Sequence, residues 1–158
     1  MDASQIHLAL NHFPLIVTFC GAALIAYAII VRHLTILRVG IVFLVVATFT
    51  TIPTYLSGEG AEDIAESFPG VSEAYIHAHE ESAELTIVLI GLQGIVSLTV
   101  LVLIRNKTEF PGLASIILIL MSIFVFVAVG RTAHLGGQIR HQELRPGNAL
   151  SSPAEETE

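Results

Sequence analysis

Four long apolar runs constrain the fold of this chain more than any other feature of its sequence. They cover residues 13–31, 39–56, 85–104 and 112–129, and none of them contains Asp, Glu, Lys or Arg. A helix crosses the hydrocarbon core of a bilayer with about 20 apolar residues, so each run is close to the length of one span. The chain is 53% hydrophobic and only 13% charged, whereas the surface of a soluble domain needs far more charge. We therefore predict an all-α integral membrane protein folded as a four-helix bundle.

The segments outside these runs are predicted to complete one domain over residues 1–145. Acids at helical spacing follow the flexible Ser57-Gly58 pair, which predicts a short amphipathic helix over residues 59–67 on the outer membrane surface. Asp2 with Gln5 three residues later resembles a capping box, so the first helix is expected to begin before the membrane. The polar residues 146–158 are predicted to form a disordered tail.

Two adjacent glycines after the fourth run carry a further prediction. Gly136 and Gly137 are expected to break or sharply bend the helix where it leaves the membrane, because glycine weakens a helix interior. His141 would then fold back over the end of the bundle. In the alternative interpretation the two glycines serve only as a C-cap of the helix.

Charge asymmetry predicts the orientation in the membrane. Four spans place both termini on one side. The short connections on the other side carry basic residues against the single acid Glu109; the basic residues are Arg32, Arg38, Arg105 and Lys107. By the positive-inside rule this second side faces the cytoplasm. Both termini and the long middle loop are therefore expected on the periplasmic side of a bacterial inner membrane.

Histidines are predicted to gather at the outer end of the bundle, and only His33 is placed at the other end. The outer six are His7, His12, His77, His79, His134 and His141. Most residues outside the spans lie on this side, so the number alone carries little weight. Their placement is more informative, because the first, third and fourth helices each present an imidazole at similar depth. Imidazole is a ligand of haem iron and of zinc, copper and non-haem iron.

Helical spacing predicts which of these histidines point in different directions. His7 and His12 are five residues apart, which is about 140° around a straight helix, so they are expected to meet different partners. His77 and His79 are about 200° apart, so only one of them can face the bundle interior. Glu80 and the neighbouring acids either orient an imidazole through its second nitrogen or form a solvated charged turn.

Arginines and further acids complete the candidate site. Arg131 and Arg140 lie at the outer end of the fourth run, where they would suit carboxylates, including haem propionates. The alternative is that these arginines only extend toward the membrane surface. Glu59 and Glu62 on the predicted surface helix are candidate ligands for a divalent ion, with a solvated acidic face as the competing interpretation.

Four separated motifs carry a resemblance to a known family. They are Ile6-His7-Leu8-Ala9-Leu10-Asn11-His12-Phe13-Pro14, Ser57-Gly58-Glu59-Gly60-Ala61-Glu62, His79-Glu80-Glu81 and Leu135-Gly136-Gly137-Gln138-Ile139-Arg140-His141. Together they resemble a bacterial family of small membrane proteins, domain-of-unknown-function family 2231, over nearly the whole chain. The resemblance implies roles for His7, His12, His79 and His141, whereas His77 and His134 lie outside its pattern. Some members are fused to Rieske or cytochrome-type domains, which implies redox work at the outer membrane face.

We predict that His7, His12, His79 and His141 converge at the outer end and ligate one or two b-type haems for electron transfer. Bis-histidine ligation takes two imidazoles from different helices, and a bundle core is a usual place for it. One alternative is a zinc, copper or iron site with the same histidines, and its secondary candidates are His77, His134, Glu59, Glu62 and Glu80. The other is a cofactor-free structural subunit of a larger membrane complex.

An electron-transfer or metal-binding protein is favoured over a stand-alone catalyst. The expected partners are membrane lipid and a redox protein at the periplasmic face. Ligand pairing, the number of cofactors and homo-oligomerisation stay open.

Several other function classes are poorly supported by the sequence. The chain has no basic patch and a net charge of −7, so nucleic-acid binding is excluded. No span contains an acid or a base, which argues against an ion pump or transporter. No nucleophile–base pair and no phosphate loop indicate hydrolysis or group transfer. Cys20 is the single cysteine and lies inside an apolar run, so it is expected to be a small core residue.

Overall fold

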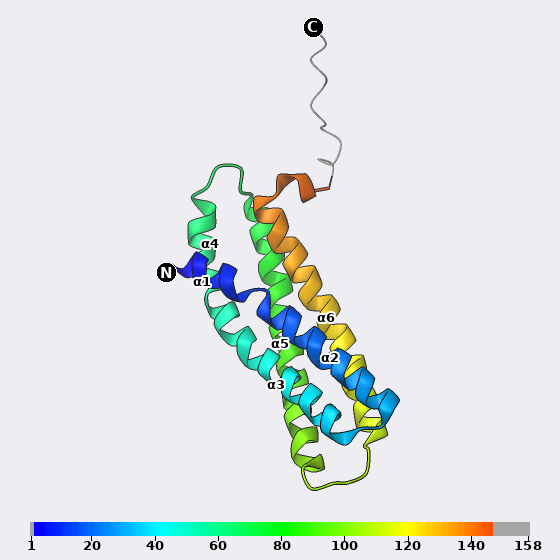
Figure 1. Ribbon diagram of the computed structural model, residues 1–158. Coiled ribbons are helices and arrows are strands. Elements are labelled where there is room, and N and C mark those ends of the chain that lie inside the picture. The colour runs from blue at the N-terminus through cyan, green and yellow to red at the C-terminus, as the bar shows by residue number, and fades with distance from the viewer. Residues whose placement is uncertain (1, 147–158) are drawn as a thin grey trace.

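The computed structural model describes residues 2–146, and every regular element over that range is helical (Figure 1). The elements are α1 (Ala3–Leu10), α2 (Phe13–Val31), α3 (Leu34–Leu56), α4 (Gly58–Glu66), α5 (Glu73–Ile104), α6 (Gly112–Arg140) and the short 3₁₀ helix η1 (Gln142–Leu144). The all-α prediction is confirmed. Apart from Pro146, the tail that the sequence predicts to be disordered lies outside the described residues.

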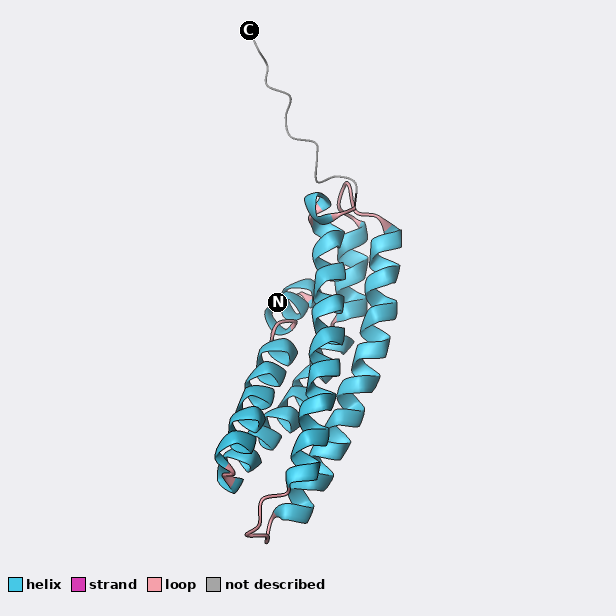
Figure 2. Ribbon diagram, turned by 90° about the vertical axis from the view of Figure 1, so that its right-hand side faces the viewer, coloured by secondary structure: helices cyan, strands magenta, loops and turns pink. Residues whose placement is uncertain are grey.

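Helices α2, α3, α5 and α6 form a closed four-helix bundle. Helix α2 packs on α3 and α6, and α5 packs on the same two helices from the opposite corner. Figure 2 shows the long helices running side by side, with connections mainly at the two ends. Four chain segments are long and apolar enough to cross a membrane. This architecture is that of a multi-pass membrane protein.

The bundle places apolar side chains on its outside as well as in its core. Ile30 is 78% exposed and Phe124 is 72% exposed, both on spanning helices. Two apolar clusters fill the interior, one around Ile41 and the other around Ile90. Since lipid is as apolar as this core, burial of apolar surface alone cannot hold the helices together, and close contact between small residues has to contribute.

A pair of glycines provides such a contact between α2 and α3. A Cβ atom added to Gly21 would lie 2.7 Å from Leu44 Cδ2 and 3.0 Å from the Gly40 carbonyl oxygen. A Cβ atom added to Gly40 would lie 2.8 Å from Ile25 Cγ1. The two backbones therefore approach each other more closely than any larger residues would permit.

At the histidine end, α5 continues beyond the membrane. Residues 85–104 span about 30 Å at 1.5 Å per residue, which already covers the hydrocarbon core. The first turns, residues 73–84, carry four glutamates and are too polar for a hydrocarbon core. Helix α4 follows the end of α3, and α1 packs on both. These outer parts position the candidate site.

The start of α1 agrees with its sequence signal. Asp2 Oδ1 accepts a hydrogen bond of 2.8 Å from the Gln5 backbone N–H, and Gln5 Oε1 accepts one of 3.2 Å from the Asp2 backbone N–H. The predicted capping box is thus confirmed. Helix α1 ends at Leu10, and α2 begins after a turn at Asn11 and His12, with Pro14 in its first turn.

The prediction that Gly136 and Gly137 break the last helix is wrong. Helix α6 continues through both glycines to Arg140. The His79 ring packs over Gly136, and Leu144 Cδ1 lies 3.5 Å from where a Cβ of Gly137 would be. The intrinsic cost of glycine in a helix is only about 1 kcal/mol per residue, so packing of this helix end against α5 and η1 outweighs it.

Candidate functional site

His7 is held at the junction of α1, α3 and α4. Its Nδ1 lies 3.0 Å from the Thr54 carbonyl oxygen and 3.4 Å from Ser57 Oγ. Thr54 belongs to the last turn of α3, where carbonyls have lost their regular helical partners and are open to side chains. A carbonyl oxygen only accepts hydrogen bonds, so Nδ1 must carry the proton. The other ring nitrogen, Nε2, takes no part in these contacts.

His79 is held in the same way between α5 and α6. Its Nδ1 lies 2.9 Å from the Thr132 carbonyl oxygen, which again makes Nδ1 the protonated nitrogen. The Thr132 hydroxyl lies 2.8 Å from Ser82 Oγ and 2.9 Å from Thr86 Oγ1. This hydroxyl cluster joins α5 and α6 directly below the imidazole. Gly136 leaves room for the ring, because an added Cβ would lie 3.0 Å from His79 Cε1.

The two imidazoles face each other across the end of the bundle. Their ring centres are 6.4 Å apart and their planes are almost perpendicular, at 87°. Each ring donates Nδ1–H to a backbone carbonyl, and Nε2 takes no part in that hydrogen bond. That arrangement is typical of histidines that bind a metal, because the second hydrogen bond fixes the ring orientation and raises the basicity of the ligand nitrogen.

The charge state of His79 also suits a ligand. Burial lowers the pKa of His79 below its ordinary value, and the nearby His7 acts in the same direction. The Thr132 carbonyl and Glu80 oppose this shift but do not cancel it. The imidazole is therefore neutral near pH 7, which is the form that binds metal ions.

An acid pair lies beside the histidines and joins α4 to α5. A hydrogen bond with the Glu80 side chain is the main cause that raises the pKa of Glu62 to about 7. Partial burial and the charges of Glu80, Glu66 and Asp63 raise it further. Glu62 therefore keeps its proton at a pH where an ordinary carboxyl group has lost it.

The structure brings together two of the four histidines expected to converge. His12 precedes α2, is exposed, and makes no capping hydrogen bond through its side chain. His141 lies beyond the end of α6, where its Nδ1 is 2.9 Å from Glu143 Oε1. The expected divergence of His7 and His12 is confirmed, since His7 is half-buried and His12 points to solvent.

The secondary candidates lie around this pair rather than in it. His77 is 75% exposed and close to Glu80 and Glu81, at 3.7 and 3.5 Å. His79 faces inward instead, which confirms that only one of these two histidines does so. The Nε2 atom of the exposed His134 lies 3.1 Å from Gln138 Nε2, and Glu59 is exposed in the first turn of α4.

The two candidate arginines occupy different environments. The Arg140 guanidinium lies over the Phe68 ring, 4.2 Å from its centre. Arg131 is exposed on the turn of α6 that holds His79.

Sequence reasoning missed the residues that orient the imidazoles and tie the outer end together. Thr54 and Thr132 act through backbone carbonyls, which leave no residue-type signal. Arg145 donates hydrogen bonds to the carbonyls of Gly70, Gln138 and Ile139 and stacks on Tyr75. It fastens the loop between α4 and α5 to the end of α6. An aromatic residue, Tyr75, in the polar first turns of α5 is the sequence signal that points to this contact.

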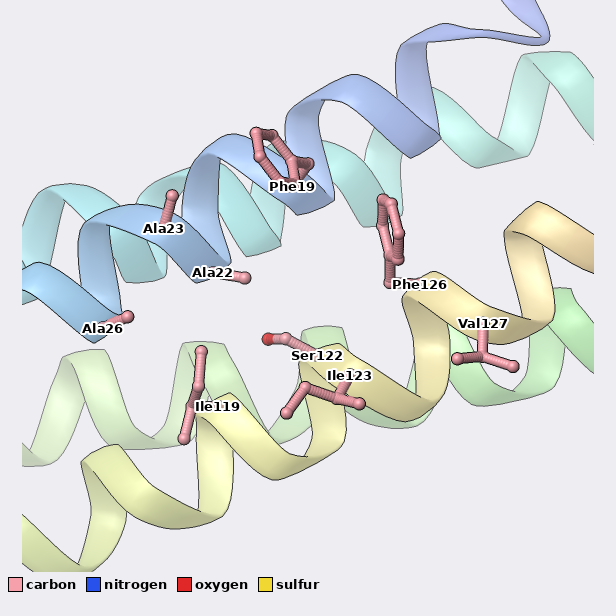
Figure 3. A pocket seen from close by; sticks show the side chains of 9 residues that line it. All are labelled: Phe19, Ala22, Ala23, Ala26, Ile119, Ser122, Ile123, Phe126 and Val127. Atoms are coloured by element: carbon pink, nitrogen blue, oxygen red, sulfur yellow. The ribbon is translucent and has the colours of Figure 1, made fainter.

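Within residues 2–146, no group of three or more His, Cys, Asp and Glu side chains is arranged to hold a metal ion. The donor set at the candidate site is thus the two imidazoles. A separate groove of about 290 Å³ lies between α2 and α6, below the Phe19 and Phe126 rings (Figure 3). Its lining is apolar apart from Ser122, and neither His7 nor His79 contributes to it.

No family model, curated protein or solved structure matches this chain. The resemblance to domain-of-unknown-function family 2231 therefore stays a prediction. The geometry of His7 and His79 is the feature of the molecule that bears on its function.

Proposed function

We propose that this protein is a b-type haem protein of electron transfer, with His7 and His79 as the two axial ligands. The observation that carries the proposal is the distance of 6.4 Å between their ring centres. A metal–nitrogen bond is about 2.0–2.1 Å and a nitrogen lies about 1 Å from its ring centre, so two imidazoles on opposite sides of one metal have centres about 6 Å apart. A tetrahedral angle would bring them to about 5 Å. The separation matches two imidazoles on opposite sides of one metal, and it is also that of an ordinary edge-to-face ring pair, so the spectrum of the purified protein distinguishes the two.

The size of the donor set favours haem over a bare ion. A structural zinc site takes four protein ligands and a catalytic one takes three, whereas the described residues offer two imidazoles. A porphyrin brings four equatorial nitrogens of its own and needs only the two axial positions from the protein. One ligand pair accounts for one haem.

Several residues around His7 and His79 have specific roles in the proposed site. The Thr54 and Thr132 carbonyls fix both rings in the tautomer that frees Nε2 and increase its basicity. Gly58 and Gly136 keep the space next to the imidazoles clear of side chains. Arg131 can pair with a propionate, as guanidinium groups do with carboxylates. When bound, the haem supplies a one-electron redox couple.

The positive charge on the short connections supports a site that faces the periplasm, with membrane lipid around the spans and a redox protein as the partner. This sidedness has its own test. A cysteine introduced in place of Glu59 should react with a membrane-impermeant thiol reagent in intact cells, whereas one in place of Lys107 should react only after lysis. The opposite pattern would refute the proposed orientation.

The haem proposal is tested with the full chain purified after expression with ample haem. A Soret band and a bis-histidine reduced spectrum are expected, and His7→Ala or His79→Ala should each abolish that spectrum. His12→Ala and His141→Ala are matched controls and should retain it. Absence of a Soret band would refute the proposal. Stoichiometric zinc, copper or iron would then indicate a non-haem site, and absence of any metal would indicate a structural subunit.

A further inference from the structure

A second polar layer lies deep in the membrane part of the bundle, away from the histidine pair. It consists of Thr18 on α2 and of Gln93 and Ser97 on α5, which are 0%, 2% and 0% exposed. Thr18 Oγ1, Gln93 Oε1 and Ser97 Oγ are fully buried and have no hydrogen-bond partner among residues 2–146. A buried polar group without a partner is costly in any protein interior, and most of all where lipid surrounds the bundle.

Other hydroxyls of the spanning helices avoid this cost within their own helix. Thr51 donates to the Ala47 carbonyl at 2.8 Å, and Ser122 donates to the Leu118 carbonyl at 2.8 Å. Thr18 and Ser97 make no such bond. Two hydroxyl donors and one amide carbonyl are therefore left without a partner in the core.

The packing of the neighbouring turns places Thr18 and Gln93 at one level, with Ser97 one turn further along. Leu15 of α2 packs against the cluster of Ile90, Val125 and Val129. Helices α2 and α5 run in the same direction from the histidine end (Figure 1). Thr18 and Gln93 each follow by three residues on the inner face, so they lie one turn below that cluster, and Ser97 follows one turn later on the face of Gln93.

Apolar packing closes this layer on both sides. The Ile90 cluster separates it from the hydroxyl cluster below His79, and a larger apolar cluster that includes Ile25, Leu44 and Leu118 lies beyond it. The layer is therefore an isolated site rather than part of a continuous path toward the histidines.

We propose that Thr18, Gln93 and Ser97 bind a buried water molecule that bridges α2 and α5 across the diagonal of the bundle. One water accepts hydrogen bonds from the two hydroxyls and donates one to Gln93 Oε1. Three hydrogen bonds are the usual number for a buried water. The bridge joins two helices that face each other across the bundle, and it is independent of what the histidine pair binds.

The test compares unfolding of the full chain in lipid nanodiscs for Thr18→Val, Ser97→Ala and the double variant. If a water is shared, each single substitution lowers the unfolding midpoint, and the double variant lowers it by less than the sum of the two. Ser122→Ala is the matched control, because this buried serine is already bonded to its own helix. Its effect should be small and additive with Thr18→Val.

An increase of the unfolding midpoint in Thr18→Val or Ser97→Ala would overturn the proposal. Removing an unpartnered hydroxyl raises the midpoint when no water is bound to it. Additive effects of Thr18→Val and Ser97→Ala would also overturn the proposal. Infrared spectroscopy gives a direct second readout. A water O–H band that shifts in oxygen-18 water is expected in the wild type and should be lost in Gln93→Met. Its absence from the wild type would refute the bridge.

Discussion

Gly136 offers the most discriminating test of the histidine site, because the effect of one added methyl group can be worked out from the structure. The substitution Gly136→Ala places a Cβ atom 3.0 Å from His79 Cε1 and 3.2 Å from Nδ1. Ordinary contacts begin near 3.4 Å, so the ring has to recede by about 0.4 Å. Gly130, on the same helix, has nothing within 4 Å of an added Cβ and provides the control.

Gly136→Ala is predicted to weaken haem binding more than it changes the free energy of unfolding, because two opposing effects on stability nearly cancel. The hydrogen bond from His79 to Thr132 is 2.9 Å long, and a displacement of about 0.4 Å takes it past the usual range. That loss costs about 0.5–1.5 kcal/mol. Replacing glycine by alanine in a helix returns about 0.5–1 kcal/mol. The unfolding free energy should therefore stay within about 1 kcal/mol of the wild type.

Haem binding should respond more strongly than stability. A ligating histidine that loses its second hydrogen-bond partner, here the Thr132 carbonyl, binds metal about 10–100-fold more weakly. Haem titration of the purified protein, followed at the Soret band, should show this loss for Gly136→Ala. Gly130→Ala should bind as the wild type does and be more stable by about 0.5–1 kcal/mol. Nitrogen NMR shifts of the His79 ring report the same displacement without haem. Equal affinities and unchanged His79 shifts in the two variants would refute the reasoning.

Two further predictions concern packing and pH. Gly94→Ala should lower the unfolding free energy by about 1–3 kcal/mol, because the new Cβ would lie 2.7 Å from Thr48 Cγ2 and closer still to Thr48 Oγ1. Gly91→Ala, which meets nothing within 4 Å, should raise it, and similar shifts for both in denaturant titrations would contradict this. The pKa of Glu62 is raised to about 7 in the folded protein from an ordinary 4.5, so protonated Glu62 stabilises the fold. This stabilisation is complete below pH 4.5 and is lost as the pH rises through 7. The protection of the α4 amides, after correction for the intrinsic pH dependence of exchange, should accordingly fall above pH 7 in the wild type and in the control Glu59→Gln, but not in Glu62→Gln. Equal pH dependence of protection in all three would count against the Glu62–Glu80 pair.

Local signals in the sequence account for most of the fold. A span is recognisable because about 20 consecutive residues share one property, and the capping box at Asp2 and Gln5 is recognisable because both partners lie within three residues. Helix α2 has the bounds 13–31 of the first apolar run, whereas α3 begins five residues before its run, at Leu34. Apolar runs mark the part of a helix that meets lipid, and helices α5 and α6 continue into the polar segments outside it.

The candidate site was only half accessible to the same reasoning. The helical angle correctly separates His79 from His77, since both lie on α5 and the angle depends on spacing alone. His7 and His12 also diverge, but the cause is the turn at Asn11 and His12 that ends α1. The partners that fix the two imidazoles are carbonyls of Thr54 and Thr132, 47 and 53 residues away in the chain. No local pattern encodes such a contact, because every residue has a carbonyl and only the packing of helices selects one.

The expectation that His141 joins the pair depended on Gly136 and Gly137 ending α6, and the structure shows why that step fails. Helix α6 continues to Arg140, so His141 is nine residues beyond Thr132, and at 1.5 Å per residue it is carried about 13 Å along the axis. A fold-back would have returned it to the level of His79. The same glycine that was expected to break the helix instead leaves room for the His79 ring, 3.0 Å from its missing Cβ. One local propensity, outweighed by packing, thus decides whether His141 lies at the level of the histidine pair or beyond it.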